Sequence, residues 1–346
     1  MNTTETRPSS PSPSTKRRGR DVFGVFANVR ETGIFVFIIL LIVVISLRTS
    51  NFLNVANFRD ILLDISILVI IAIGQTMVII THGIDLSLGS AIGLSAMTVG
   101  VYLKGHPDTS PAAALLMGIG LGALMGSFNG LLVTVGKIPP IIVTLGTLSI
   151  FRGLLYVVGQ GAWVNADELS EPFKHFTTNT LFGIPYLVLY AAVAVLIFFY
   201  FLNYSRTGRQ IYAVGGNPIA AQQAGIRMNR INYLVFLLSG VLAGAAGVFW
   251  LSRFANAANN TALGWELQSV AAAVVGGVSI AGGTGTVPGV VLGSLVLGII
   301  NNAVNLVGIS PFVKQALYGL VILLAVILDS VISRRLQKVL TARRTV

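Results

Sequence analysis

The chain has 346 residues, of which 54% are hydrophobic and only 10% are charged, and its mean hydropathy is +0.82. Soluble domains carry roughly 25% charged residues, so this composition excludes an ordinary soluble enzyme, a nucleic-acid-binding domain and a fibrous protein. The net charge of +11 comes from basic residues between apolar runs, which is a signal of membrane topology. With no cysteine and three widely separated histidines, neither a disulfide framework nor a metal site is expected.

The N-terminal part of the chain is polar. Residues 1–20 are rich in Ser, Thr and Pro and end in a basic cluster, so we interpret residues 1–32 as a disordered basic cytoplasmic tail. A cleaved signal peptide is not expected, because the first apolar run begins only near Gly33 and its exit lacks a small-x-small cleavage pattern.

Apolar segments that suit membrane-spanning helices follow along the chain. They cover 33–48, 61–82, 87–103, 111–135, 140–158, 184–202, 232–252, 267–281, 288–307 and 312–331. The prediction is an all-α polytopic membrane protein with about ten transmembrane helices, in one permease domain over residues 33–331. Closely spaced glycines in 111–135 favour close helix contacts.

Lysine and arginine predict the orientation. The loop 203–231 carries four arginines and no acid, and residues 332–346 form a basic tail, whereas the loop 159–183 is mainly acidic. The positive-inside rule therefore places 203–231 and both termini in the cytoplasm and 159–183 outside. Two termini on one side require an even number of spans, which ten satisfies.

A weak internal repeat relates the two halves of the chain. A shift of 172 residues places Gly126 on Gly298, Asn129 on Asn301, Gly136 on Gly308 and Pro139 on Pro311. In the ten-helix topology the two copies cross the membrane in opposite directions, as inverted repeats of transporters do. The identities are few, so chance among glycine-rich helices is the alternative.

The cytoplasmic loop contains a short helix whose two ends are specified. Asn217 suits the N-cap, Pro218 the first helical position and Gly225 the C-cap. A helix of about two turns is marginal alone in water, which favours one that docks into the groove of a partner. The predicted docking residues are Gly216, Asn217, Pro218, Ala220, Ala221, Ala224 and Gly225. A purely structural loop helix is the alternative.

The stretch from His82 to Ser90 interrupts two apolar runs with a carboxylate, hydroxyls and two glycines. One interpretation is a broken helix that lines a cavity, with Asp85 and Ser87 as functional candidates. The other is a short turn in which Asp85 caps the next helix. The two interpretations are compatible.

Other polar residues in or beside apolar runs are candidates for a translocation path. They are Thr144, Arg152, Trp265, Glu266, Asn301 and Asn302. Arg152 needs an inward partner or an interfacial position. Trp265 and Glu266 suit a polyol at an external mouth, although a tryptophan there is also a typical interfacial anchor. Asn301 and Asn302 either join helices or face an aqueous path, and Asp64 is interpreted as a boundary residue.

No enzyme active site is visible. The stretch from Gly130 to Lys137 has five residues between its glycines and an isoleucine after the lysine. A phosphate-binding loop needs four residues and then Ser or Thr. We therefore expect no catalytic residue, no metal and no cofactor on this chain.

These segments together resemble the permease subunit of bacterial ABC importers for monosaccharides of the ribose, xylose, arabinose, galactose and rhamnose group. The resemblance spans roughly residues 50–332. It rests on Gly-Ile-Asp-Leu-Ser-Leu-Gly-Ser at 83–90, 141–148 with Arg152-Gly153, 208–226, Glu266-Leu267 with Ala271-Ala272, 276–285 and 301–310. A common family form has Val at position 88 and Tyr at position 265, where this chain has Leu and Trp. Autoinducer-2 import permeases are also similar, notably around 61–153.

The resemblance implies a protein of the bacterial cytoplasmic (inner) membrane with several partners. These are a second permease chain, identical or different, a double-headed cytoplasmic ATPase that uses ATP and Mg, a periplasmic sugar-binding protein, and membrane lipid. The short helix at 217–225 then resembles the coupling helix that docks on the ATPase. Autoinducer-2 import is one alternative function. An ion-coupled secondary sugar transporter, with Asp85 and Arg152 as its intramembrane charges, is another.

Overall fold

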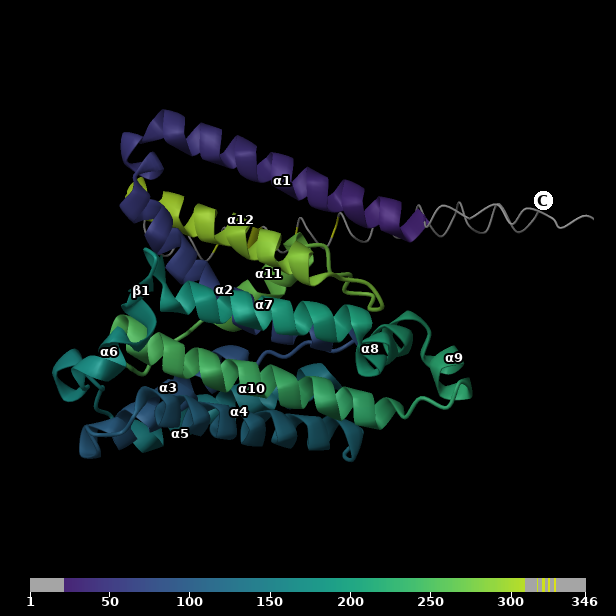
Figure 1. The fold of residues 1–346 in the computed structure, drawn as a ribbon. Helices are drawn as coiled ribbons and strands as arrows, with labels where there is room; N and C mark the ends of the chain where they lie inside the picture. The colour runs from purple at the N-terminus through teal and green to yellow at the C-terminus, as the bar shows by residue number, and fades with distance from the viewer. Residues whose placement is uncertain (1–21, 309–315, 317–318, 321–322, 324–326, 328–346) are drawn as a thin grey trace, which may run out of the picture.

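The computed structural model describes residues 22–308 and, beyond them, residues 316, 319, 320, 323 and 327 (Figure 1). Its helices are α1 Val22–Arg48, α2 Val55–Ile80, α3 Leu88–Gly105, α4 Pro111–Thr134, α5 Pro140–Gly159, α6 Glu171–Thr178, α7 Tyr186–Tyr204, α8 Arg206–Gly216, α9 Pro218–Gln223, α10 Met228–Phe254, α11 Trp265–Val275 and α12 Val287–Leu306. Two 3₁₀ turns, Ser50–Leu53 and Ala166–Glu168, and the antiparallel strands β1 Thr180–Leu181 and β2 Ile184–Pro185 complete the described elements.

The all-α polytopic fold is confirmed at this level. In the described part of the chain, six helices are long and apolar enough to cross a membrane, namely α2, α4, α5, α7, α10 and α12. Nine of the predicted segments coincide with a helix. The tenth, 312–331, falls mainly outside the described residues, as do residues 1–21 and the tail 332–346.

Two predicted boundaries are wrong. Helix α1 begins at Val22, so residues 22–32 are helical instead of forming part of a disordered tail. Apolar residues at 22, 25, 26 and 29 follow a helical period. The prediction missed this period because it placed the start of the helix at the longer apolar run that begins near Gly33. Helix α11 ends at Val275, short of the predicted 281, because Gly277 adopts a φ of 97°, a conformation that ends helices.

Helices α2 and α10 form the centre of the bundle. Helix α2 is buried over most of its length, and α10 packs on α4 through glycines on both helices. A Cβ on Gly126 would lie 3.0 Å from Gly240 Cα, and one on Gly122 would lie 2.8 Å from Gly244 Cα. Only glycine permits this approach, so the predicted close helix contact is confirmed.

The two ends of the bundle carry different elements. The start of α1 lies at the same end as α8 and α9, and α6 and β1 lie at the opposite end (Figure 1). Two hydrogen bonds agree with this arrangement. Tyr212 of α8 bonds the loop before α12, whereas Asn302, near the end of α12, bonds Asn57 near the start of α2. Helix α12 therefore runs from the α8 end to the opposite end.

Candidate functional site

A buried hydrogen-bond network closes the break between α2 and α3 around Asp85, which is 1% exposed. Ser87 donates to Asp85 Oδ1 through its hydroxyl (2.6 Å) and its backbone N–H (3.0 Å). Ser239 of α10 donates to Oδ2 at 3.3 Å, and Asn129 of α4 donates to Ser87 Oγ at 2.9 Å. The amide of Gln75 fits the Asp85 backbone in the orientation that donates to its carbonyl and accepts from its N–H. Asp85 therefore ties the break to α4 and α10.

The structure brings Thr144 to the same break. Its hydroxyl donates to the carbonyl of Ile84 at 3.0 Å and so adds α5 to the network. Asp85, Ser87 and Thr144 are each at most 1% exposed, so they hold the break in shape and do not face an open path. Asp85 accepts from Ser87, which precedes α3, and so forms an Asx turn. The second of the two interpretations, a turn in which Asp85 caps α3, is therefore correct for the turn and wrong for the cap.

Arg152 has the inward partners that its position in an apolar run requires. From α5 its Nη1 donates to the carbonyls of Thr261 (2.8 Å) and Asn259 (3.2 Å), in the loop between α10 and α11. Glu266 at the start of α11 lies near enough to interact electrostatically with it. Its Oε2 lies against the start of α3 at Gly89, and within the described part of the chain this buried oxygen has no hydrogen-bond partner. Arg152 and Glu266 thus join α5, α11 and α3.

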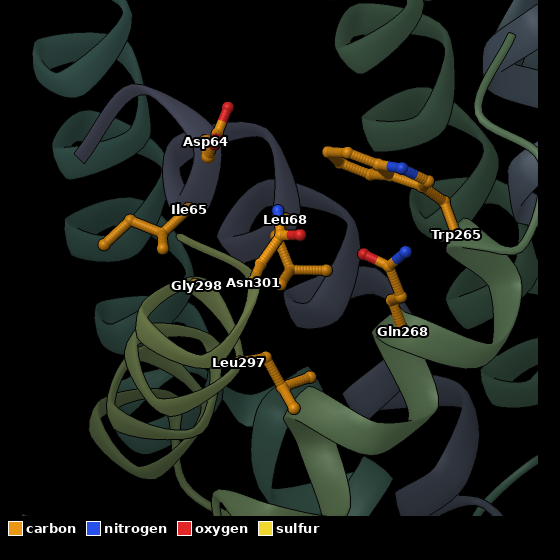
Figure 2. A pocket seen from close by; sticks show the side chains of 8 residues that line it. All are labelled: Asp64, Ile65, Leu68, Trp265, Gln268, Leu297, Gly298 and Asn301. Atoms are coloured by element: carbon orange, nitrogen blue, oxygen red, sulfur yellow. The ribbon is translucent and has the colours of Figure 1, made fainter. Parts of the chain in front are cut away.

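A small, partly open pocket with a cavity volume of about 20 Å³ lies between α2, α11 and α12. Its lining combines an aromatic ring, two amides and a carboxylate with apolar side chains. The residues are Asp64, Ile65, Leu68, Trp265, Gln268, Leu297, Gly298 and Asn301. Figure 2 shows Trp265 and Gln268 reaching from α11 toward Asn301 and Leu68. In this conformation the pocket has room for about one water-sized group, with polar side chains set among apolar ones.

Two features make the pocket suitable for a single hydrogen-bond donor group. Asn301 Oδ1 is buried, and no described residue donates a hydrogen bond to it. Trp265 is held by an edge-on contact with Trp250 of α10, with ring centroids 4.9 Å apart at 80°. The ring is therefore fixed in place, and the unsatisfied acceptor favours a donor such as a hydroxyl group.

The predicted path residues thus separate into groups. Trp265 and Asn301 line the pocket, whereas Glu266, the next residue after Trp265, faces α3. Asn302 donates to Asn57 Oδ1 of α2 at 2.7 Å, which confirms the helix-joining interpretation for this residue.

The sequence interpretation missed two pocket residues and one ion pair. Gln268 and Asp64 line the pocket, and Asp64 binds Arg253 of α10 at 2.6 Å. The Arg253 side chain is 9% exposed and also stacks on Phe254 at 4.9 Å. A charged residue at the end of a long apolar segment was the available signal, because such a charge needs a partner.

The short helix α9 begins as the sequence predicts. Asn217 Oδ1 accepts from the N–H of Ala220 at 3.0 Å, Pro218 opens α9, and Gly225 has a φ of 78°. The helix itself is shorter than expected, at six residues. These outcomes confirm Asn217 as the N-cap and Pro218 as the first helical residue, whereas the C-cap is Ala224 and Gly225 follows it in the left-handed conformation.

One predicted docking residue of α9 is placed differently. Ala221 is only 4% exposed and faces the body of the protein, whereas Ile219 is 72% exposed and Ala220 and Ala224 are also exposed. An open hollow lies next to α9 and is lined by Gln222, Ile226, Arg227, Met228, Asn229 and Arg230. The free surface of α9 is therefore small and apolar and borders a basic hollow.

Known proteins resemble this chain over most of its length. The family described as "Branched-chain amino acid transport system / permease component" matches residues 57–326. The chain is 36% identical over 302 residues to the ribose import permease protein RbsC of Bacillus subtilis (strain 168), covering 87% of this chain and 93% of that protein. It is 35% identical over 317 residues to the galactose/methyl galactoside import permease protein MglC of Escherichia coli (strain K12), covering 87% and 94%.

A third relative has a different cargo in its name. The chain is 35% identical over 302 residues to the autoinducer 2 import system permease protein LsrC of Yersinia pseudotuberculosis serotype O:1b (strain IP 31758), covering 87% of this chain and 85% of that protein. No solved structure matches the chain.

Proposed function

The chain belongs to the family of branched-chain amino acid transport system permease components, and we propose that it is the membrane-spanning permease subunit of an ABC importer for a monosaccharide. The observation that carries this proposal is its 36% identity to a ribose import permease over nearly the full length of both proteins. The chain is a multi-pass protein of the bacterial cytoplasmic (inner) membrane and acts as a transport subunit. The particular sugar is open, because ribose and galactose permeases are similarly related to it.

The end of the bundle that carries α8 and α9 is the cytoplasmic end. Arg206, Arg209, Arg227 and Arg230 are all exposed there, and such clusters stay inside by the positive-inside rule. The start of α1 lies at this end (Figure 1), which supports a cytoplasmic N-terminus. The positive-inside rule places the basic residues of 332–346 at the same end.

The two halves form an inverted repeat. Adding 172 to the bounds of α2, α3 and α4 gives 227–252, 260–277 and 283–306, and the corresponding helices are α10 at 228–254, α11 at 265–275 and α12 at 287–306. Helix α2 runs toward the α8 end and α10 away from it, so the copies cross in opposite directions. Whole helices coincide, which supports a repeat more strongly than the few identical residues do.

The sugar contacts the pocket of Trp265, Gln268, Asn301 and Asp64 during its passage. The Trp265 ring offers a flat apolar face for the C–H side of a sugar ring, and the amides and carboxylate suit its hydroxyls. The other predicted path residues act as positioning residues that hold the helices around this path. They are Asp85, Ser87, Thr144, Arg152, Glu266 and Asn302.

The energy for transport comes from ATP hydrolysis on a partner protein. Helix α9 docks on a cytoplasmic ATPase that binds ATP and Mg, through Ile219, Ala220 and Ala224 with Gly216, Asn217, Pro218 and Gly225 at the rim. A periplasmic sugar-binding protein delivers the cargo at the opposite end. Two permease chains, identical or different, form the central path, surrounded by membrane lipid.

Purification and reconstitution test this function. The chain is purified in mild detergent from its native membrane, and the proteins that accompany it are identified by mass spectrometry. The complex and its binding protein are then placed in liposomes with ATP and Mg at the ATPase side. We expect uptake of a labelled pentose or hexose only with ATP. A complex without an ATPase whose uptake follows an ion gradient contradicts the proposal and makes Asp85 and Arg152 the residues to examine.

Autoinducer-2 import is the second candidate, because the chain is 35% identical to LsrC. Autoinducer-2 import has the same ATP-driven mechanism as monosaccharide import and differs only in the molecule transported. Including labelled autoinducer 2 beside ribose, xylose, arabinose, galactose and rhamnose in the same assay distinguishes the two functions.

A further inference from the structure

The end of α8 meets two other segments backbone to backbone. Gly215 of α8 lies against the carbonyl oxygen of Ile80, the last residue of α2, and a Cβ on Gly215 would overlap that oxygen. Gly283, in the loop between α11 and α12, donates its N–H to the same carbonyl at 2.9 Å. A Cβ on Gly283 would lie 2.7 Å from Gly216 Cα. We call Ile80, Gly215 and Gly283 the α8 junction.

A tyrosine side chain adds a hydrogen bond beside the α8 junction. Tyr212, one turn earlier on α8, donates its hydroxyl to the carbonyl of Gly285 at 2.8 Å. Burial raises the pKa of the Tyr212 phenol to about 12, so the hydroxyl keeps its proton and remains a donor at physiological pH. Helix α8 therefore holds the loop before α12 through both Tyr212 and Gly215.

The junction lies between the two regions that transport has to connect. On one side, α8 continues within two residues into α9, the exposed apolar tip. On the other side, Ile80 directly precedes the break that Asp85 ties to α4 and α10 and that Thr144 ties to α5. Gly283 precedes α12, which carries Asn301 of the pocket.

Contacts of this kind transmit displacement with little loss. No side chain lies between the three backbones, so no rotamer change absorbs a movement of α8. Packed elements of this kind change between discrete arrangements instead of deforming gradually. A shift of α8 thus moves the end of α2 and the start of α12 together.

We propose that the α8 junction, with Tyr212 as its fastening residue, transmits the movement of α9 to the α2–α3 break and to α12, and so couples ATP hydrolysis on the partner to opening of the path. This inference rests on the proposed ABC permease function. Gly215, Gly283 and Tyr212 are positioning residues, because they touch neither the sugar nor ATP.

The test measures ATP hydrolysed per sugar imported by the reconstituted complex with its ATPase and binding protein. Tyr212→Phe is expected to raise this ratio about threefold through loss of one hydrogen bond. Gly215→Ala and Gly283→Ala, which separate the backbones, are expected to raise it about tenfold, within the range of coupling energies between sites. Co-purification with the ATPase is expected to be unchanged, because the surface of α9 is intact.

Matched variants control for general damage. Gly120→Ala adds a methyl group to a helical glycine with no atom within 4 Å of the new Cβ, and Tyr200→Phe changes a tyrosine that is 67% exposed. Both are expected to keep the wild-type ratio. A purely structural defect lowers the amount of folded complex but leaves the ratio of ATP to sugar unchanged.

The outcomes separate the inference from the function on which it rests. If the wild-type complex imports sugar with ATP and the Tyr212→Phe complex keeps the wild-type ratio, the junction does not couple and the inference is wrong. The test of the inference needs only the Tyr212→Phe variant. This substitution removes one oxygen, so the variant is expected to fold even if the glycine variants fail to insert. A wild-type chain without ATP-driven uptake contradicts the proposed function, and the inference falls with it.

Discussion

Asn129 of α4 and Asn301 of α12 lie at corresponding places on two helices, and their side chains meet different surroundings. Each lies five residues before the last residue of its helix, Thr134 and Leu306 respectively. Asn129 is 1% exposed and donates to Ser87 at 2.9 Å, whereas Asn301 lines the pocket and its Oδ1 receives no hydrogen bond from a described residue. The same residue type thus has a buried, hydrogen-bonded place in one half and a place at the pocket in the other.

This difference predicts opposite effects of two matched substitutions. Asn129→Ala is expected to lower the free energy of unfolding by about 1–3 kcal/mol, because Ser87 loses a buried partner. Asn301→Ala is expected to leave the unfolding midpoint nearly unchanged and to lower sugar uptake about fivefold through loss of a ligand hydrogen bond. Thermal unfolding in detergent and uptake in liposomes measure the two effects, with the exposed Asn203→Ala as control. Equal effects of both variants on stability contradict the assignment.

Trp265 gives a second prediction for the pocket. Trp265→Ala is expected to lower the rate of sugar uptake about fivefold, because an aromatic face contributes roughly 0.5–1.5 kcal/mol beyond its buried area. Trp265→Phe and Trp265→Tyr keep an aromatic face and are expected to retain most of the rate. Phe128→Ala, at a position that is 45% exposed on α4, is the control. Normal uptake by a correctly inserted Trp265→Ala chain excludes this ring from the path.

The helices were largely predictable and the site only in part. Hydropathy reports burial in lipid or protein along one segment, so the helix positions follow from the local sequence. The surroundings of Asp85 depend on residues far away in the chain, since Asn129 and Ser239 come from other helices. No local pattern encodes such contacts, and neither interpretation of Asp85, as a cavity-lining residue or as a helix cap, included them.

Trp265 and Glu266 show a second reason why the site was only partly predictable from the sequence. They are adjacent in sequence and were assigned together to one external mouth. Successive residues of a helix point about 100° apart, so Trp265 faces α12 and Glu266 faces α3. Predicting which of them lines the pocket requires the rotation of α11 about its axis, which packing against other helices sets.

The ion pair of Asp64 and Arg253 predicts a non-additive effect on stability. Asp64→Asn alone is expected to cost about 3 kcal/mol, because it leaves the largely buried Arg253 without this partner. Arg253→Met is expected to cost less, because the Asp64 side chain is 32% exposed. The double variant is expected to cost less than the sum of the two, since it leaves no unpaired charge. A double-mutant cycle of unfolding free energies in detergent measures this coupling. Additive costs contradict a direct role of the 2.6 Å contact between α2 and α10.

Exposure along α9 predicts which alanines contact the ATPase. Ala220→Glu and Ala224→Glu place a charge on the exposed apolar surface and are expected to abolish ATPase co-purification and uptake while the unfolding midpoint stays near that of the wild type. Ala221→Glu buries a carboxylate at a position that is 4% exposed, so it is expected to lower the midpoint itself. Gln210→Glu, on the neighbouring α8, adds the same charge elsewhere and serves as control. Retained ATPase binding by a stable Ala220→Glu, Ala224→Glu double variant moves the docking surface away from α9 and toward the neighbouring hollow around Arg227 and Arg230.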